Sequence, residues 1–356
     1  MIANGTHPKI PVGSPVPPLI HGISDQYLII LLPIVIHWAA SAIFEACDRF
    51  NWLSRYRIHT SAEELTKNKV TRLDCFVSTI KCQVMQSCLG IVLTWSSEPD
   101  LMEDVEAGVS TWACRARVAL MTLKQGMAVV GPSLGTVDCT LPLPSSATGI
   151  ANDTSITIDV LAGKALYWYL MPLLKIIIAL IVADGWMYTI HRMEHTNKWM
   201  YKENFHYQHH RLYVPYAWGG SYNHIFDSII VDGLAYSLGC WAVALPTRST
   251  LLLFGYSTLK NVSDHCGYVF PWDPIRAITG TDASFHDVHH QSWGLKTNFG
   301  AHLAIWDWLM GTHFDDAAEI ARHRARSRLN AEKMLLRSDT KREAEKGRSV
   351  NASKLD

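Results

Sequence analysis

The stretch ALYWYLMPLLKIIIALIVADGWMYTIHRMEH, from Ala165 to His195, decides the fold, because a long apolar run passes directly into a histidine pair. Its first part, Ala165 to Tyr188, is long enough to cross the hydrocarbon core of a bilayer in spite of Lys175. His191 and His195 are four residues apart, so a helix places both imidazoles on one face. The sequence therefore predicts a transmembrane helix that ends in histidines at a membrane face.

Two further spans are expected earlier in the chain. The run from Tyr27 to Ala46 is apolar apart from one acidic residue at its far end. No basic region precedes it and no small-residue cleavage pattern follows it, so we interpret it as a retained anchor. The second candidate, Cys75 to Trp95, is weaker because Lys81 and two glutamines interrupt it. It either crosses the bilayer or lies partly in the interface.

A hairpin is expected between the later histidines. The apolar regions Ile225 to Leu245 and Leu251 to Val262 are separated by Pro246, and proline between two helical runs indicates a turn. A single crossing here would place the last histidines on the opposite side of the bilayer from the first. A hairpin that enters the membrane and returns keeps all of them on one side.

The orientation follows from the loop after the first span, which holds six basic residues, whereas residues 1–26 hold one. By the positive-inside rule this loop is cytosolic, Ser96 to Lys164 is lumenal, and the chain from His191 onward faces the cytosol. We expect four parts: a lumenal segment (1–26), an anchor region with its loop (27–164), a catalytic domain (165–316) and a basic cytosolic tail (317–356).

Composition excludes some classes of protein. The 32 basic and 32 acidic residues balance, so the chain as a whole has no electrostatic footprint for nucleic acid. Hydrophobic residues make up 48% of the chain and charged residues 18%, as is typical of membrane proteins. The eight cysteines are scattered and include no C-x-x-C pair, so we expect buried thiols rather than disulfides or a zinc site.

Histidines follow a repeated pattern. HRMEH (191–195) is followed by HYQHH (206–210) and HDVHH (286–290), and residues 191–290 hold ten of the 17 histidines. We call these three motifs the first, second and third histidine boxes. Helical spacing lets each box present a cluster of imidazoles in one direction. Two more histidines, His224 and His265, lie at the ends of the hairpin.

Ten imidazoles exceed what one ion can bind, so the number favours two metals. The candidate ligands are His191, His195, His206, His209, His210, His224, His265, His286, His289 and His290. The other seven have no such pattern, and a structural role is the better interpretation for each: His7, His21, His37, His59, His302, His313 and His323.

The order of these motifs resembles the fatty acid hydroxylase and sterol desaturase superfamily. Within it, DGWMYTIHRMEH, LYVPYAWGGSYNH and FHDVHHQSWGLKTNF are similar to the sphinganine C4-hydroxylases. The resemblance covers roughly Trp168 to His313 and implies an all-α, multi-pass membrane bundle with a cytosolic-facing helical cap. It also implies that the ten candidate histidines hold two iron ions, or zinc as purified, which activate O2 to hydroxylate a lipid.

The resemblance implies a substrate and partners as well. The expected substrate is sphinganine or dihydroceramide, hydroxylated at carbon 4 in the endoplasmic reticulum membrane. The sequence contains no heme, flavin or nicotinamide motif, so electrons must come from another protein. The family's donor is cytochrome b5, supplied by NADH or NADPH through a reductase. The basic tail is typical of a solvated face and also fits docking of an acidic partner.

Two alternatives remain open from the sequence. A related hydroxylase or desaturase would act on a sterol or a secondary-metabolite aminoalcohol. A non-catalytic membrane protein would use the same histidines to hold or transport zinc, although a transport site is expected at mid-depth in the membrane rather than at its face.

Overall fold

A computed structural model of the chain describes residues 11–95, 97–127, 154–202 and 206–352. All regular elements in these ranges are helices, which confirms the predicted all-α fold. The α-helices are α1 (Asp25–Arg49), α2 (Ser61–Lys67), α3 (Arg72–Trp95), α4 (Val105–Met127), α5 (Thr154–Ala165), α6 (Met171–Thr196), α7 (Lys198–Lys202), α8 (His206–His209), α9 (Leu234–Ala242), α10 (Thr247–His265), α11 (Pro274–Thr279), α12 (Ala283–His290), α13 (Ile305–Met310) and α14 (Ala317–Ala352). The 3-10 helices η1 (Ser54–Tyr56) and η3 (Ala217–Ser221) and the π-helices η2 (Leu166–Leu170) and η4 (Asp227–Gly233) complete the set.

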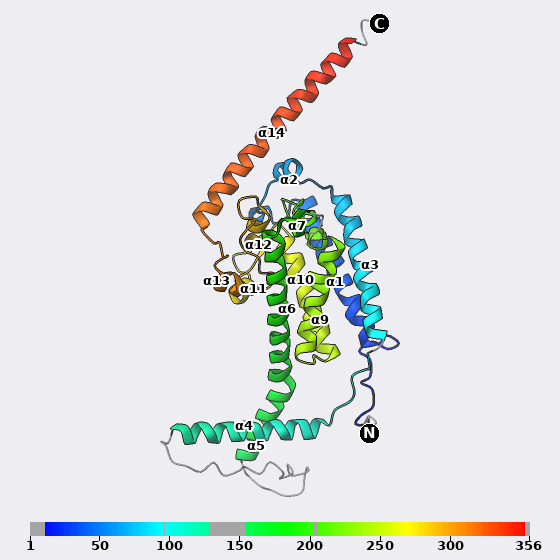
Figure 1. Cartoon of the computed structure of the whole chain (residues 1–356), viewed down its shortest axis with the longest axis vertical. Helices are drawn as coiled ribbons and strands as arrows, with labels where there is room; N and C mark the ends of the chain where they lie inside the picture. Colours follow the sequence, from blue (N-terminus) through cyan, green and yellow to red (C-terminus); the bar gives the residue numbers. More distant parts are fainter. Residues whose placement is uncertain (1–10, 96, 128–153, 203–205, 353–356) are drawn as a thin grey trace, which may run out of the picture.

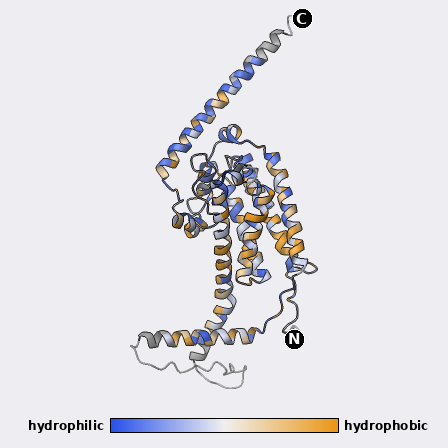
Figure 2. Ribbon diagram, viewed as in Figure 1, coloured by the Kyte–Doolittle hydropathy of each residue, from blue (hydrophilic) through white to orange (hydrophobic). Residues whose placement is uncertain are grey.

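Three helices are long and apolar enough to cross a membrane, in agreement with the three predicted spans. They are Asp25–Arg49, Arg72–Trp95 and Ile158–Thr196, the last of which includes α6. Figure 2 shows apolar residues concentrated on α1, α3 and α6, whereas α14 is largely hydrophilic. The protein is therefore a multi-pass membrane protein.

The glutamines that weaken the second span face other helices. Trp38 of α1 donates a hydrogen bond from Nε1 to Gln83 of α3 at 2.9 Å. Gln86 donates to the carbonyl oxygen of Ser228 in η4 at 3.2 Å. Polar side chains within membrane helices usually face the bundle interior, where partners are available. Both glutamines thus join α3 to its neighbours.

The predicted hairpin is formed by η4, α9 and α10, and it lies between α6 and α1 (Figure 1). On one side, Gly239 of α9 allows close approach to α6, because an added Cβ would lie 2.3 Å from the carbonyl oxygen of Ala179. On the other, Gly255 of α10 faces Ile36 of α1. The hairpin returns the chain to the end of α6 that carries the histidines. It is not among the helices that meet the length and hydropathy expected of a span.

The two ends of the molecule differ. Figure 1 places α2, α7, α12 and the start of α14 at one end, and α4 and α5 at the other. At the first end, His59 of the basic loop contacts Asp287 of α12 through Nε2 and Oδ1 at 2.6 Å. The predicted arrangement, in which the basic loop, the histidine boxes and the basic tail share one side, agrees with this packing.

The cysteines differ from the expectation of buried thiols at two positions, and the first is Cys88, which is exposed. Cys114, in α4, is disulfide-bonded, whereas six others are free thiols: Cys47, Cys75, Cys82, Cys88, Cys240 and Cys266. The expectation that no cysteine would form a disulfide was wrong for Cys114. Scattered spacing carries no information on pairing, which depends on how the helices are placed.

Candidate metal centre

Four helix ends bring nine of the ten candidate histidines together. The last turns of α6 carry His191 and His195, and α8 with the residue after it carries the second box, 206–210. His265 is the last residue of α10, and α12 carries the third box, 286–290. All nine side chains are buried or partly buried at this meeting point.

The nine imidazoles form two groups, within each of which one nitrogen per histidine lies within 4.8 Å of the others. The first group is His191, His195, His206, His210 and His289, and the second is His209, His265, His286 and His290. A tetrahedral or octahedral ion needs four to six ligands. The groups therefore match the expectation of two ions in number and in kind of ligand.

The second and third boxes are each divided between the two groups. His206 and His210 belong to the first group and His209 to the second, whereas His286 and His290 belong to the second and His289 to the first. Helical residues four apart share a face, but a neighbouring residue points about 100° away. The expectation that each box would point in one direction therefore needs correction, because both boxes contribute to both groups.

The nitrogen–nitrogen distances suit a shared ion. In the first group, Nε2 of His206 lies 2.9 Å from that of His191 and 3.0 Å from that of His210. In the second, Nε2 of His286 lies 2.9 Å from that of His265 and 3.0 Å from that of His290. Two nitrogens that bind one ion at about 2.1 Å and at right angles lie about 3.0 Å apart. The side chains are thus already at chelating distances.

The other ring nitrogens point outward and are held by the backbone. Nδ1 of His191 donates to the carbonyl of Phe299 at 2.9 Å, and Nδ1 of His290 donates to that of Leu212 at 2.8 Å. Equivalent bonds join His289 to Thr297, His265 to Asn261 and His209 to Tyr222. A carbonyl only accepts, so Nδ1 carries the proton and the Nε2 lone pair faces inward. Metal-binding histidines are typically oriented in this way.

Burial keeps these imidazoles neutral. Burial, followed by the neighbouring imidazoles, holds the pKa of His210 and His290 well below the ordinary 6.5. Burial also lowers the pKa of His289 to about 3. Nε2 of His289 is buried without a hydrogen-bond partner, although its Nδ1 is bonded. A buried, inward-facing lone pair without a donor fits a metal ligand.

Two buried carboxylates adjoin the first group. Nδ1 of His206 lies 3.3 Å from Oδ2 of Asp227 and 3.4 Å from Oε2 of Glu194. Asp227 orients His206 through this hydrogen bond, as the carbonyls orient the other imidazoles. Asp227 belongs to no sequence motif that predicts a role at the site. Its position could have indicated a role, because Asp227 lies at the start of an apolar run and an acidic side chain in a membrane is costly unless it has a function.

His224 is the one candidate that the structure does not bring into either group. It lies just before η4, where its Nδ1 accepts a hydrogen bond from the backbone N–H of Phe226 at 3.1 Å. Its role as a ligand stays a prediction. Among the other histidines, the six in the described ranges also lie outside both groups, and His7 lies outside the described residues.

A buried polar network contacts the third histidine box on the side away from the imidazole groups. We call it the His59 network, and its members are His59, Glu63, Asp287 and Arg324. Asp287 points away from the metal groups and contacts His59, while Nη2 of Arg324 in α14 donates to its Oδ2 at 2.8 Å. His59 also contacts Glu63 of α2 through Nδ1 and Oε1 at 3.1 Å. The network ties α2 and α14 to the helix that carries three candidate ligands.

Comparison with known proteins gives consistent matches. The model of the fatty acid hydroxylase family matches residues 176–312, a range that contains all ten candidate histidines. The sphingolipid C4-hydroxylase SUR2 of Saccharomyces cerevisiae is 31% identical over 94% of this chain and 85% of its own length. The sphingolipid C4-hydroxylase of Schizosaccharomyces pombe is 29% identical over 85% of this chain and 93% of its own length. Sphinganine C4-monooxygenase 2 of Arabidopsis thaliana is 27% identical over 83% of this chain and 91% of its own length. No solved structure gives a significant match.

Proposed function

The chain belongs to the fatty acid hydroxylase family and is an oxidoreductase, and from this premise we propose that it hydroxylates carbon 4 of sphinganine or dihydroceramide. The product would be a phytosphingosine-type lipid. The names of three relatives that match most of the chain, the two yeast sphingolipid C4-hydroxylases and the Arabidopsis thaliana sphinganine C4-monooxygenase, support this substrate. The observation that carries the proposal is the pair of buried imidazole groups with Nε2 atoms at chelating distances.

The chemistry of the donor set favours iron. Neutral imidazole suits iron and zinc alike, so zinc is a plausible occupant of purified protein. Two iron ions held by these groups would supply the activation of O2 that attack on an unactivated C–H bond requires. We assign the first group to one ion and the second group to the other, with His224 as a further candidate ligand.

The chain's own residues orient and shield these groups. Backbone carbonyls and Asp227 fix the rotation of the rings, which keeps the inward lone pairs aligned. The ring of Phe299 packs between the first and third boxes, with centroids 5.5 Å from those of His191 and His289. This buried phenyl ring limits the access of water from its side of the first group.

Apolar surface beside the site fits a lipid substrate. A cavity of about 250 Å³ is lined mainly by apolar side chains of α6, α11, α13 and the segment before α13, among them Ile181, Leu303 and Trp306. Ile181 belongs to a candidate span, so the cavity adjoins the hydrocarbon layer. Trp306 packs on Gly185, two turns before the first histidine box. Part of a long alkyl chain would fit here while its head remains near the membrane face.

We place the enzyme in the endoplasmic reticulum membrane with the active site on the cytosolic side. The basic loop after α1 supports this orientation, and the disulfide-bonded Cys114 at the opposite end fits an oxidising lumen. Electrons would come from NADH or NADPH through a reductase and cytochrome b5. The parts proposed above keep their bounds: 1–26 is a lumenal segment, 27–164 the anchor region whose part from Ser96 to Lys164 is lumenal, 165–316 the catalytic domain, and 317–356 a cytosolic tail.

The proposal is tested by the long-chain bases of a host cell that makes no 4-hydroxylated base. Expression of the wild-type chain should produce 4-hydroxysphinganine, free or within ceramide, and expression of His289→Ala should not. Feeding labelled sphinganine or labelled dihydroceramide shows which form is taken. A hydroxylated sterol as the only product, or no hydroxylated lipid while the protein is in the membrane with iron bound, would contradict the proposal.

A further inference from the structure

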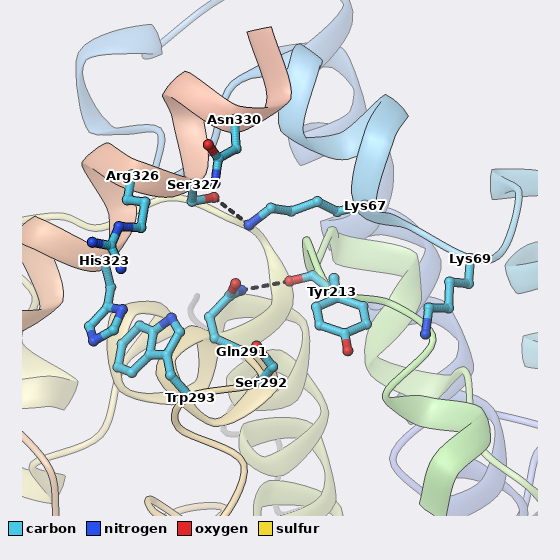
Figure 3. Close-up of a pocket in the computed structure, with 10 residues that line it drawn as sticks. All are labelled: Lys67, Lys69, Tyr213, Gln291, Ser292, Trp293, His323, Arg326, Ser327 and Asn330. Carbon is cyan, nitrogen blue, oxygen red and sulfur yellow. Dashed lines mark hydrogen bonds between the residues drawn. The ribbon is translucent and has the colours of Figure 1, made fainter. Parts of the chain in front are cut away.

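A hollow with a basic lining lies beside the third histidine box (Figure 3). Its volume is about 320 Å³. The walls come from α2 and the residues after it, from the segment after α8, from the segment after α12 and from α14. The side chains that matter here are Lys67, Lys69, Tyr213, Gln291, Trp293 and Arg326.

The charge of this hollow is one-sided. Lys67, Lys69 and Arg326 line it together with His323, and none of its ten lining residues is acidic. Lys67 is held by a hydrogen bond to Ser327, and Nζ of Lys69 lies 5.4 Å from the centre of the Tyr213 ring. The chain as a whole has no net charge, so the positive potential is a local feature. Such a surface attracts an acidic partner and steers its approach.

One wall of the hollow is bonded directly to a histidine of the second imidazole group. Gln291 follows His290 directly in the chain and donates from Nε2 to the carbonyl of Tyr213 at 2.7 Å. The preceding residue, Leu212, accepts the hydrogen bond from Nδ1 of His290 at 2.8 Å. A single peptide unit or one hydrogen bond therefore separates this wall from a candidate ligand. An electron that enters here has a short bonded path to the second group.

The walls of the hollow are fixed relative to one another. Arg324 of α14 is held by Asp287 of α12, and Ser327 of α14 donates to Glu63 of α2. The rings of Trp293, in the segment after α12, and His323 of α14 also stack, with centroids 4.4 Å apart and planes 11° apart. The basic side chains are thus presented on a framework that three elements share. A preorganised surface loses little entropy when a partner binds.

We propose that this hollow is the docking site for an acidic one-electron carrier protein, an inference that rests on the proposed function. The buried metal groups of a hydroxylase must receive electrons through the protein, and this basic surface adjoins them. The hollow is lined by residues of α2 and α14, which lie at one end of the molecule in Figure 1, away from the apolar middle of the spans. The water-exposed domain of a carrier can reach that end.

The test is a pair of charge-reversal variants that change net charge equally. Lys69→Glu with Arg326→Glu alters the hollow, while Lys67 is left intact because it bonds Ser327. Arg337→Glu with Arg342→Glu alters exposed positions of α14 that lie roughly 16 to 24 Å further along the helix. The oxidation of reduced cytochrome b5 by each protein in nanodiscs is followed at several salt concentrations.

The rate constant should fall at least about tenfold in the first variant, with weaker salt dependence, and less than about twofold in the second. Metal content and C4 hydroxylation with a small chemical reductant should stay at the wild-type level in both. Equal carrier rates in the two variants would overturn the docking site, whatever else the hollow binds. Absence of C4 product from wild type with the chemical reductant would instead refute the proposed function, because that reaction needs no docking.

Discussion

His59 is expected to contribute to stability in a way that depends on pH. Its side chain is buried against Glu63 and Asp287, whose carboxylates contact its two ring nitrogens. Burial by itself would lower the pKa of His59, but the carboxylates outweigh it and raise the pKa to about 9. Burial would likewise raise the pKa of Glu63, but His59 and Ser327 lower it to about 2. The imidazolium and both carboxylates are therefore charged together at neutral pH.

The magnitude follows from the pKa of His59. The difference between the ordinary 6.5 and about 9 corresponds to roughly 3 kcal/mol. Because the folded state has the higher pKa, this contribution is fully present below pH 6.5 and is lost as the pH rises through about 9. His59→Gln removes the charge, while Asp287 keeps Arg324 and Glu63 keeps Ser327 as partners. The variant should therefore fold with reduced stability.

Thermal unfolding in nanodiscs, followed by tryptophan fluorescence, measures this effect. Below pH 6.5 the Tm of His59→Gln should lie several degrees under that of wild type, and above pH 9 the two should nearly coincide. His21→Gln, at an exposed position near α1, is the matched control and should follow wild type throughout. A difference between wild type and His59→Gln that does not change with pH would refute the charged network.

Three further outcomes are expected. His209→Ala and His289→Ala should each abolish C4 hydroxylation while membrane insertion, measured by alkaline extraction, is unchanged; retained product in either would remove that residue from the ligands. Gly294→Ala should lower Tm and metal content, because an added Cβ would lie 2.1 Å from the carbonyl oxygen of Val288, and overpacking of this kind costs about 1–3 kcal/mol. If Gly294→Ala keeps the metal content of wild type, the backbone around Val288 can shift to accept the added Cβ, and the prediction is wrong. Cys114 should resist alkylation until a reductant is added, as mass spectrometry of its peptide can show, and labelling without reductant would argue against the disulfide.

The membrane helices were predictable because their length and apolar content are local properties of the sequence. The span expected from Tyr27 to Ala46 is found as α1, Asp25–Arg49, with the same centre. The weaker span was uncertain because sequence does not show which way Gln83 points. Its bond from Trp38 depends on the placement of α1, which is a tertiary property.

The histidine boxes were predictable as a metal site, but their division was not. Repeated helical spacing predicts convergence, and nine of the ten residues converge. The placement of His209 and His206 in different groups depends on which histidines of the neighbouring helices lie beside each of them, and that is a tertiary property. His224 was proposed from its place at the end of the hairpin and in the family's pattern, and it lies outside both groups.

The residues that support the histidines could not be predicted from spacing in the sequence. Asp287 lies inside a histidine box, yet it contacts His59, which is 228 positions away in the chain. Asp227 and His206 likewise meet only after the hairpin is folded. Such pairs depend on which helices become neighbours, and local pattern does not contain that information.

We propose that the two groups of imidazoles bind two metal ions and that hydroxylation requires both. The most direct test is the metal content of anaerobically purified, iron-supplied protein, with C4 hydroxylation assayed in the same sample. Wild type should hold two iron ions per chain and form product. His195→Ala and His265→Ala, which remove one ligand from the first and second groups respectively, should each lose iron and activity. Full hydroxylation by protein that holds one iron ion or none would contradict the account.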